Sequence, residues 1–178
     1  GAGGIRGAEI CLSYPSVGAT EQAILASVLA EEVTVVHGAA KEPEIESLCD
    51  FLNNMGAVIC GMGTEHLMIQ GVRRLHDSSF RVDGDRIVAG TYGAAAAAAG
   101  GDVLLKGVKP SDLREPLRIL GRMGARIQPE EKEGRIRISM DGVPGAVHIC
   151  TGPYPQFPTD LQSPFMAALA CGQRTSRV

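Results

Sequence analysis

The sequence contains no tryptophan, and its aromatic side chains are limited to three tyrosines and four phenylalanines. Proteins that bind single-stranded nucleic acid usually stack the bases on aromatic side chains, and few are available here. The charge balance also argues against nucleic-acid binding, because 17 basic and 20 acidic side chains give a net charge of −3 and no excess of positive charge. We therefore expect no nucleic-acid partner.

Long hydrophobic runs are also lacking. One long uncharged stretch, residues 87–101, is rich in alanine and glycine and is shorter than the roughly 18 apolar residues that a membrane span needs. The first ten residues show no basic segment followed by an apolar one, as a signal peptide would. We expect no membrane partner and a cytoplasmic location.

The cysteines and histidines show no spacing typical of metal ligands. There are five cysteines, an odd number, and they are far apart in the sequence: Cys11, Cys49, Cys60, Cys150 and Cys171. The four histidines form no HExxH motif. We expect reduced thiols that act as small apolar side chains in the core, no metal site and no cofactor.

What the sequence does contain is an internal repeat. Met55-Gly56-Ala57 recurs as Met123-Gly124-Ala125, and Gly18-Ala19-Thr20 resembles Ala89-Gly90-Thr91. A third copy of the repeat begins near Thr159-Asp160. These offsets define a unit of about 70 residues that occurs twice and begins a third time, so the chain looks like a fragment of something longer.

The first unit reads as strand, helix, strand, helix and hairpin. Residues 5–14 supply the first strand, and Thr20 is expected to cap a helix with Ile24, Leu25, Val28 and Leu29 on its buried face. Residues 33–36 are β-branched and predict a strand. Pro43 starts a second helix that Gly56 ends, and strands at 57–60 and 66–69 form the hairpin.

The second unit repeats this order. A helix is expected at 88–99, a strand at 102–106, a helix capped by Ser111, and strands at 125–128 and 135–139. The third unit would begin with a strand at 145–151 and a helix at 160–170. The fold class is therefore α/β (α+β), built from repeated βαβαββ units.

Two loops that lead into helices could carry chemistry. The stretch Tyr14–Thr20 is rich in small polar residues, and a helix N-terminus with free N–H groups suits a phosphate. A capped turn without a ligand is the alternative. In the second loop, prolines stiffen the approach to Thr159 and Asp160. Asp160 is either a general base or hydroxyl-orienting carboxylate, or simply a helix cap.

Six segments together resemble a known family. They are PSVGAT (15–20), AKEPEI (40–45), FLNNMGA (51–57), GTEHLMIQGV (63–72), DRIVAGT (85–91) and PYPQFPTD (153–160). In order and spacing they are similar to the UDP-N-acetylglucosamine 1-carboxyvinyltransferases, a family of enolpyruvyl transferases, over residues 5–172. Those enzymes act at the first committed step of peptidoglycan synthesis, and so serve cell wall biogenesis, cell shape and cell division.

The resemblance implies an inside-out α/β barrel of βαβαββ units in two domains. Residues 1–84 would be the C-terminal part of the catalytic domain, and residues 85–178 the start of the second domain. The implied partners are UDP-N-acetylglucosamine, phosphoenolpyruvate and the remainder of the parent enzyme. The family's acid cysteine lies on a loop that this sequence lacks, so we expect the chain to be inactive alone, and self-association of the fragment is possible.

The resemblance also implies roles for particular residues. Asp160 matches the family's aspartate near the attacking 3-hydroxyl. The positions that match substrate-binding or cleft residues are Tyr14, Pro15, Ser16, Val17, Gly18, Thr159, Glu42, Glu44 and Arg86. Tyr14 stands where the family often has a basic residue, and Val88 where it often has glutamate. For Glu42 and Glu44 a role at a helix N-terminus is the alternative, and for Arg86 a surface ion pair.

Two other functions are compatible with these features. One is the related enolpyruvyl transfer to shikimate 3-phosphate, which shares the fold. The other is a stand-alone βαβαββ module that binds a nucleotide sugar or another protein without catalysis.

Overall fold

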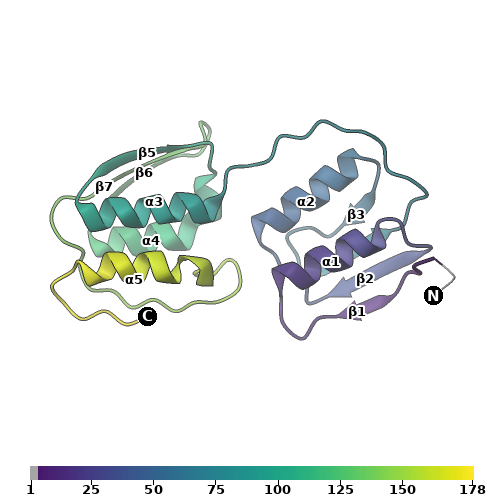
Figure 1. Cartoon of the computed structure of the whole chain (residues 1–178), viewed down its shortest axis with the longest axis horizontal. Coiled ribbons are helices and arrows are strands. Elements are labelled where there is room, and N and C mark those ends of the chain that lie inside the picture. The colour runs from purple at the N-terminus through teal and green to yellow at the C-terminus, as the bar shows by residue number, and fades with distance from the viewer. Residues whose placement is uncertain (1–3) are drawn as a thin grey trace. The chain divides into compact units, whose positions relative to one another are not determined.

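The computed structural model describes residues 4–178 and consists of two compact units that divide between Val82 and Asp83 (Figure 1). Each unit has its own sheet and its own apolar core. The mixed α/β class predicted from the sequence is confirmed. The assignment of residues 1–84 and 85–178 to parts of two family domains stays a prediction.

The first unit has the predicted βαβαββ order. Its elements are β1 (Glu9–Cys11), α1 (Val17–Ser27), β2 (Val33–His37), α2 (Pro43–Asn54), β3 (Val58–Cys60) and β4 (His66–Gln70). The strands lie in the order β1-β2-β4-β3, with β1 parallel to β2 and the other neighbours antiparallel. Both helices cover one face of this sheet, as Figure 1 shows.

Alternating side chains of these strands form the core of the first unit. Val36 of β2 and Leu67 and Ile69 of β4 are buried, as are Ile24 of α1 and Ile45 of α2. Because side chains alternate along a strand, the residues between them point to the opposite face of the sheet, away from the helices. That outer face carries the histidines discussed below.

Two predictions about α1 were wrong. Leu25 and Leu29 are 51% and 57% exposed. Ile24 and Val28 face the sheet, and each leucine follows one of them in the sequence, so it points away from the sheet. The N-cap is Ser16 and not Thr20, which lies buried inside the first turn. At α2, by contrast, Pro43 starts the helix and Gly56 follows its end with a φ of 94°, as predicted.

The second unit contains three long helices and a three-stranded sheet. Its elements are α3 (Arg86–Ala99), β5 (Asp102–Lys106), the 3₁₀ turn η1 (Pro110–Leu113), α4 (Arg114–Met123), β6 (Arg126–Glu130), β7 (Arg135–Ser139), the 3₁₀ turn η2 (Thr159–Leu161) and α5 (Gln162–Ala170). The strand order is β5-β7-β6, antiparallel throughout. Strand β5 therefore lies at a sheet edge, whereas its counterpart β2 lies between two neighbours.

The core of the second unit depends on close packing of α3. Gly90 faces Leu161 so closely that a Cβ atom at Gly90 would come within 2.5 Å of the leucine Cδ1. Phe157 and Phe165 are fully buried and pack edge to face, with ring centroids 4.9 Å apart. Of the large apolar side chains of η2 and α5, Leu161, Phe165 and Leu169 are buried, but Met166 is 49% exposed.

Two further predictions for the second unit were wrong. Ser111 lies in the 3₁₀ turn and does not cap α4, which begins at Arg114. Residues 145–151 do not form a strand, because a strand needs several consecutive partners and His148 makes only an isolated parallel bridge to Arg177. Two backbone hydrogen bonds form that bridge, from the Ile149 N–H to the Arg177 carbonyl (2.9 Å) and from the Arg177 N–H to the Val147 carbonyl (3.1 Å).

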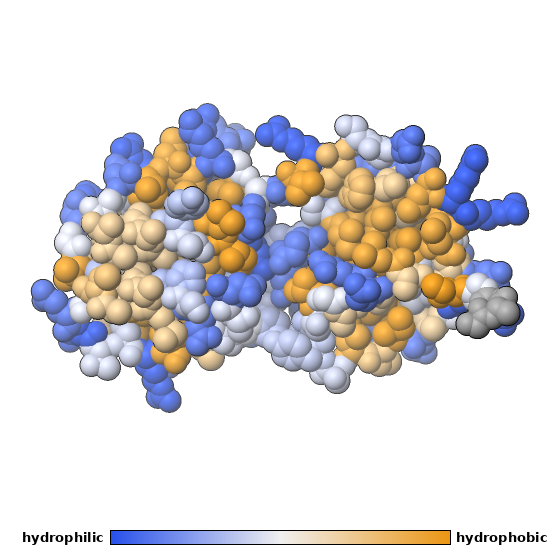
Figure 2. Space-filling view, viewed as in Figure 1, coloured by the Kyte–Doolittle hydropathy of each residue, from blue (hydrophilic) through white to orange (hydrophobic). Residues whose placement is uncertain are grey.

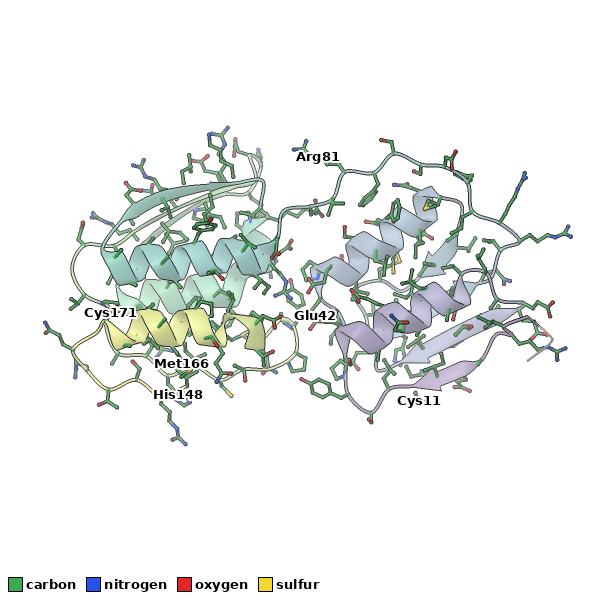
Figure 3. All side chains as sticks on the ribbon, in the orientation of Figure 1. Cys11, Glu42, Arg81, His148, Met166 and Cys171 are labelled. Carbon is green, nitrogen blue, oxygen red and sulfur yellow. The ribbon has the colours of Figure 1, made fainter. Side chains whose placement is uncertain are left out.

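The cysteines are all free, but four of the five are exposed. Only Cys49 is buried, so the prediction of core thiols was wrong for Cys11, Cys60, Cys150 and Cys171; Figure 3 labels two of these. Cys11 and Cys60 end strands, on the face that no helix covers. Within residues 4–178, no helix has the length and apolar character that crossing a membrane would require.

Candidate substrate site

The Tyr14–Gly18 loop lies where β1 ends and α1 begins. Because β1 and β2 are parallel, the loop after β2 reaches the same edge of the sheet. The two loops touch: the Leu12 N–H donates to the His37 carbonyl at 2.9 Å, and a Cβ atom at Gly38 would lie 2.4 Å from the Leu12 carbonyl oxygen. The first unit therefore places the starts of both helices at one edge, where Figure 3 also shows Glu42.

Ser16 and Thr20 hold this loop in place. The Ser16 Oγ accepts from the Ala19 N–H at 3.3 Å, and the Thr20 Oγ1 donates to the Ser16 carbonyl at 2.8 Å. The Thr20 hydroxyl also accepts from the buried Ala40 N–H at 3.0 Å, so one side chain joins both loops. This contact was missed by sequence reasoning, which read Thr20 only as a cap.

The loop is open where a ligand would approach. Tyr14 is 60% exposed, and a Cβ atom at Gly18 would meet nothing within 4 Å. The first turn of α1 contains no acidic side chain, while the first turn of α2 carries Glu44 and Glu46. A helix N-terminus attracts anions unless carboxylates already occupy it, so α1 is the better of the two for a phosphate.

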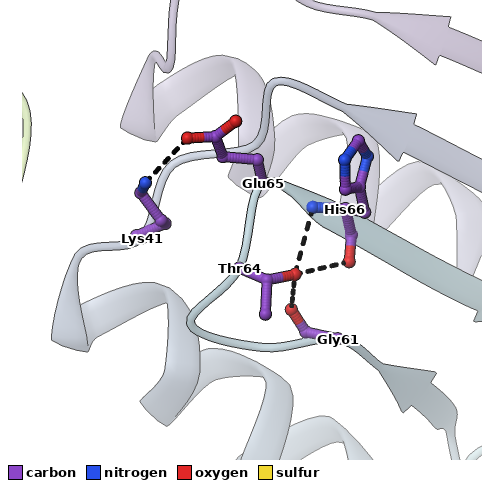
Figure 4. A network of polar contacts seen from close by, with 5 residues as sticks. All are labelled: Lys41, Gly61, Thr64, Glu65 and His66. Atoms are coloured by element: carbon purple, nitrogen blue, oxygen red, sulfur yellow. Dashed lines mark hydrogen bonds and ion pairs between the residues drawn. The ribbon is translucent and has the colours of Figure 1, made fainter.

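Glu42 and Glu44 differ in their surroundings. Glu42 is the N-cap residue of α2 and only 7% exposed, whereas Glu44 is exposed in the first turn. The loop that carries Glu42 is tied to the β3–β4 turn, because the Lys41 Nζ lies 2.8 Å from the Glu65 Oε1 (Figure 4). This hydrogen bond with Lys41 lowers the pKa of the Glu65 carboxyl.

The β3–β4 turn is itself fixed by a hydroxyl. The Thr64 Oγ1 donates to the Gly61 carbonyl at 2.8 Å and accepts from the His66 N–H at 3.1 Å (Figure 4). The ion pair between Lys41 and Glu65 therefore joins the Glu42 loop to a turn of defined shape.

In the second unit, Thr159 and Asp160 begin the 3₁₀ turn η2 that leads into α5, and both are exposed. The loop before them is anchored by Phe157, whose carbonyl accepts from the Gly152 N–H at 3.0 Å. Asp160 makes no side-chain cap hydrogen bond at the start of η2, where the N-cap residue is Pro158. The carboxylate is thus presented to solvent on a well-packed loop.

Arg86 packs against the same loop. It is the first residue of α3, only 9% exposed, and its guanidinium carbon lies 5.7 Å from the centroid of the Tyr154 ring. That distance is typical of a cation–π contact. Asp85 caps the helix, because its Oδ1 accepts from the Ile87 N–H at 2.7 Å and the Val88 N–H at 3.0 Å. The Arg86 side chain is therefore largely buried and not on the surface, while the ion pair that the sequence left open as an alternative stays a prediction.

The candidate residues therefore form two groups. Tyr14, Pro15, Ser16, Val17, Gly18, Glu42 and Glu44 lie at one edge of the first unit. Arg86, Thr159 and Asp160 lie around one loop of the second unit. None of the five cysteines lies in either group, and burial together with Asp50 and Glu46 raises the pKa of the Cys49 thiol to about 12, which makes it a poor proton donor.

The chain is similar to enolpyruvyl transferases of known sequence. The family model of EPSP synthase (3-phosphoshikimate 1-carboxyvinyltransferase) matches residues 2–177. The UDP-N-acetylglucosamine 1-carboxyvinyltransferase of Zymomonas mobilis is 49% identical over 98% of this chain, and that of Mycobacterium tuberculosis is 45% identical over 98%. The chain spans only about two fifths of the length of these relatives, 40% and 41% respectively.

Two solved structures share the fold. The enolpyruvyl transferase NikO from Streptomyces tendae matches with a TM-score of 0.67 and 22% identity, covering 86% of this chain and 37% of that one. An EPSP synthase from Acinetobacter baumannii matches with a TM-score of 0.61 and 22% identity, covering 98% of this chain and 41% of that one. At this identity the likeness concerns the fold alone.

Proposed function

This chain belongs to the EPSP synthase (3-phosphoshikimate 1-carboxyvinyltransferase) family, and from this premise we propose that it is part of an enzyme that moves the enolpyruvyl group of phosphoenolpyruvate to the 3-hydroxyl of UDP-N-acetylglucosamine. One observation carries the choice of acceptor: relatives with that activity in their names are 44–49% identical across nearly the whole chain. The solved EPSP synthase is only 22% identical. The enzyme would work in the cytoplasm at the first committed step of peptidoglycan synthesis.

In this proposal the first unit binds the nucleotide. The Tyr14–Gly18 loop, in which Tyr14 and Gly18 are exposed, offers a diphosphate the N-terminus of α1, which has no acidic side chain in its first turn. Backbone N–H groups of the first helical turn have no partner within the helix and can donate to phosphate oxygens. Tyr14 supplies no positive charge, so these N–H groups and the helix dipole would provide the attraction.

The second unit would act on the sugar hydroxyl. Asp160 accepts the proton of the 3-hydroxyl, or orients it, while the oxygen attacks C2 of phosphoenolpyruvate. The methylene carbon takes up a proton from an acid that we assign to no cysteine of this chain. Loss of phosphate from the tetrahedral intermediate, with return of a proton from the methyl group, then gives the enolpyruvyl ether.

Arg86 would contribute positive charge beside this loop. Its guanidinium is held over the Tyr154 ring and its side chain is mostly buried, so little rotamer freedom is lost when it meets an anion. A phosphate or carboxylate of phosphoenolpyruvate is the partner we propose, because clustered cations stabilise the charge of the intermediate. The remainder of the parent enzyme would supply the other cations and the acid.

A chimera tests the proposal. This chain would replace the matching segment of the Zymomonas mobilis relative, and phosphate release would be measured with phosphoenolpyruvate and either UDP-N-acetylglucosamine or shikimate 3-phosphate. We expect turnover only with the nucleotide sugar, and a loss of about 100-fold or more for Asp160→Asn. Asp141→Asn, an exposed aspartate of the same unit, is the matched control and should keep the rate. Turnover with shikimate 3-phosphate alone would reverse the choice of acceptor.

The chain alone distinguishes an enzyme fragment from a binding module. We expect no phosphate release from the isolated chain, since no acid for the methylene carbon is assigned within it. Tight binding of UDP-N-acetylglucosamine by the isolated chain, together with an inactive chimera, would favour the module.

A further inference from the structure

The outer face of the first sheet brings two histidines together. His37 of β2 and His66 of β4 are register partners in the antiparallel pair, although they are 29 positions apart in the sequence. Their Nδ1 atoms lie 3.0 Å apart, and their rings meet edge to face with centroids separated by 5.2 Å. His66 is exposed and His37 half-buried, so solvent reaches this pair.

A carboxylate selects the tautomer of the neutral His37 ring. The Glu9 Oε1 of β1 lies 2.8 Å from the His37 Nε2, and an ionised carboxylate can only accept a hydrogen bond. In the neutral ring, Nε2 therefore carries the proton and Nδ1 keeps its lone pair. His66 then donates its own Nδ1 proton to that lone pair. A carboxylate on the far nitrogen is also the usual neighbour of a histidine that binds a metal ion.

We propose that His37 and His66 form a two-imidazole binding site for a divalent transition-metal ion of the nickel or copper type. On binding, His66 moves its proton from Nδ1 to Nε2, both Nδ1 atoms become ligands, and no proton is lost. Nitrogens 3.0 Å apart and each about 2.1 Å from a shared ion subtend about 90° at it. That angle fits the square-planar or octahedral geometry of these ions better than the tetrahedral geometry of zinc.

Water would complete the coordination. No group of three or more histidine, cysteine, aspartate and glutamate side chains within residues 4–178 is arranged to hold a metal ion. Cys11 of β1 is the register partner of His37 on the side of β2 opposite to His66. It therefore lies next to the histidine pair and not between the two rings. The sequence prediction of no metal site rested on spacing, and spacing along the chain cannot reveal a pair formed across two strands.

The repeat shows that the fold does not require histidine here. In the second unit, β5 and β7 pair as β2 and β4 do, and the residues at the corresponding register are Lys106 and Arg135. Two cations occupy that position without loss of the sheet, and neither can ligate a metal ion. The histidine pair is thus a feature of the first unit alone, with a carboxylate beside it.

Titration of the whole chain with Ni²⁺, followed by calorimetry, tests the site. Ni²⁺ is chosen because Cu²⁺ would oxidise the exposed thiols. We expect one site, and a loss of affinity of at least tenfold for His37→Gln or His66→Gln. His148→Gln and Cys11→Ser are matched controls and should bind within about twofold of the original chain. Equal binding by the His66→Gln chain, or an equal loss in either control, would overturn the proposal.

Glu9→Gln tests the carboxylate separately. The amide oxygen can still accept from Nε2, but it lends the ring less basicity, so we expect affinity to fall by about tenfold. Unchanged affinity would remove Glu9 from the site. Circular dichroism of each variant checks that the fold is kept, which we expect because Glu9, Cys11, His37 and His66 lie on the face of the first sheet that no helix covers, and His148 is exposed. None of these readouts involves a nucleotide sugar, so the result is independent of the proposed enzymatic role.

Discussion

Single hydroxyls and carboxyls determine much of the local geometry around the candidate site. Thr20 is the clearest case, because its side chain contacts the loop after β1 and the loop after β2 at once. No pattern in the sequence reports such a contact, since Ala40 is 20 positions away and offers only its backbone N–H.

We predict that Thr20→Val destabilises the first unit. Valine keeps the shape but leaves the buried Ala40 N–H without its acceptor, which costs about 1–3 kcal/mol. Urea unfolding followed by circular dichroism measures the free energy of unfolding. Thr91→Val is the matched control on an exposed helical threonine, and it should change stability by less than about 0.5 kcal/mol. Equal effects of the two substitutions would show that the buried contact contributes nothing.

Asp112 gives a prediction about pH. Burial raises the pKa of this carboxyl, with Lys109 acting in the opposite direction. A carboxyl whose pKa is raised on folding stabilises the fold while it is protonated, and that contribution is lost as the pH rises through the raised value. Asp112→Asn should therefore be more stable than the original chain at neutral pH, and the difference should shrink as the solution is acidified.

Asp102→Asn is the counterpart with the opposite sign. The Arg137 hydrogen bond lowers the pKa of Asp102, so its contribution is present above the ordinary carboxyl pKa and is lost on acidification. This variant should be less stable than the original at neutral pH and should approach it in acid. Thermal unfolding at several pH values measures both. If the two variants shift in the same direction at neutral pH, the assignment of causes is wrong.

At the scale of helices and strands, the sequence predicted most of the fold. The bounds of β2, which is rich in β-branched residues, and of β7, in which polar and apolar residues alternate, lie within one residue of the prediction. Helix α2 begins at the predicted Pro43. The failures have physical reasons. Ser111 has cap chemistry, but the chain makes a 3₁₀ turn before α4. Residues 145–151 have strand-like residues but make only two isolated bridges, from His148 to Arg177 and from Thr151 to Phe157.

The candidate site was predictable only in part. Proline, glycine and small polar residues mark the loops at 14–18 and 153–160 in the sequence. The contact of Arg86 with Tyr154 and the pairing of His37 with His66 depend on how distant segments pack, and no local pattern encodes them. The assignment of Asp160 and its neighbours to catalysis or binding stays a prediction.

The packing of α3 can be tested with two glycines. Gly90→Ala should destabilise the second unit by about 1–3 kcal/mol, because the new methyl group would overlap the buried Leu161. Gly121→Ala on α4 meets nothing within 4 Å and should stabilise by about 0.5–1 kcal/mol, since alanine is the better helix former. Urea unfolding compares them. A stabilising Gly90→Ala would mean that α3 and Leu161 move apart at little cost.

At the scale of the whole chain, exposed apolar side chains remain on the helices. Figure 2 shows apolar surface over the helices of both units. Leu25 of α1 and Leu29, two residues after its end, form one stripe (the α1 stripe), and Val88 and Tyr92 form another on α3; all four are at least half exposed. Stripes of this kind usually mark surfaces that another protein or another copy covers.

We predict that the isolated chain self-associates through the α1 stripe. Replacing both Leu25 and Leu29 by glutamine should weaken association by about tenfold or more, because the transfer of two leucines from water is lost. Sedimentation equilibrium measures the association constant. Val82→Gln changes a more exposed side chain outside any helix and should leave association unchanged. A chain that stays monomeric at high concentration would contradict this prediction.

The edge position of β5 has a consequence for the aggregation of the second unit. A strand with one open side can recruit a strand from a neighbouring molecule and start an amyloid-like stack. Strand β5 is short, and it carries Asp102 at one end and Lys106 at the other, both exposed. Charges at the ends of a short apolar strand act as gatekeepers, since a parallel, in-register stack of β5 strands would bring like charges together. The two charged residues at the ends of β5 thereby oppose parallel, in-register stacking at the open side of the sheet.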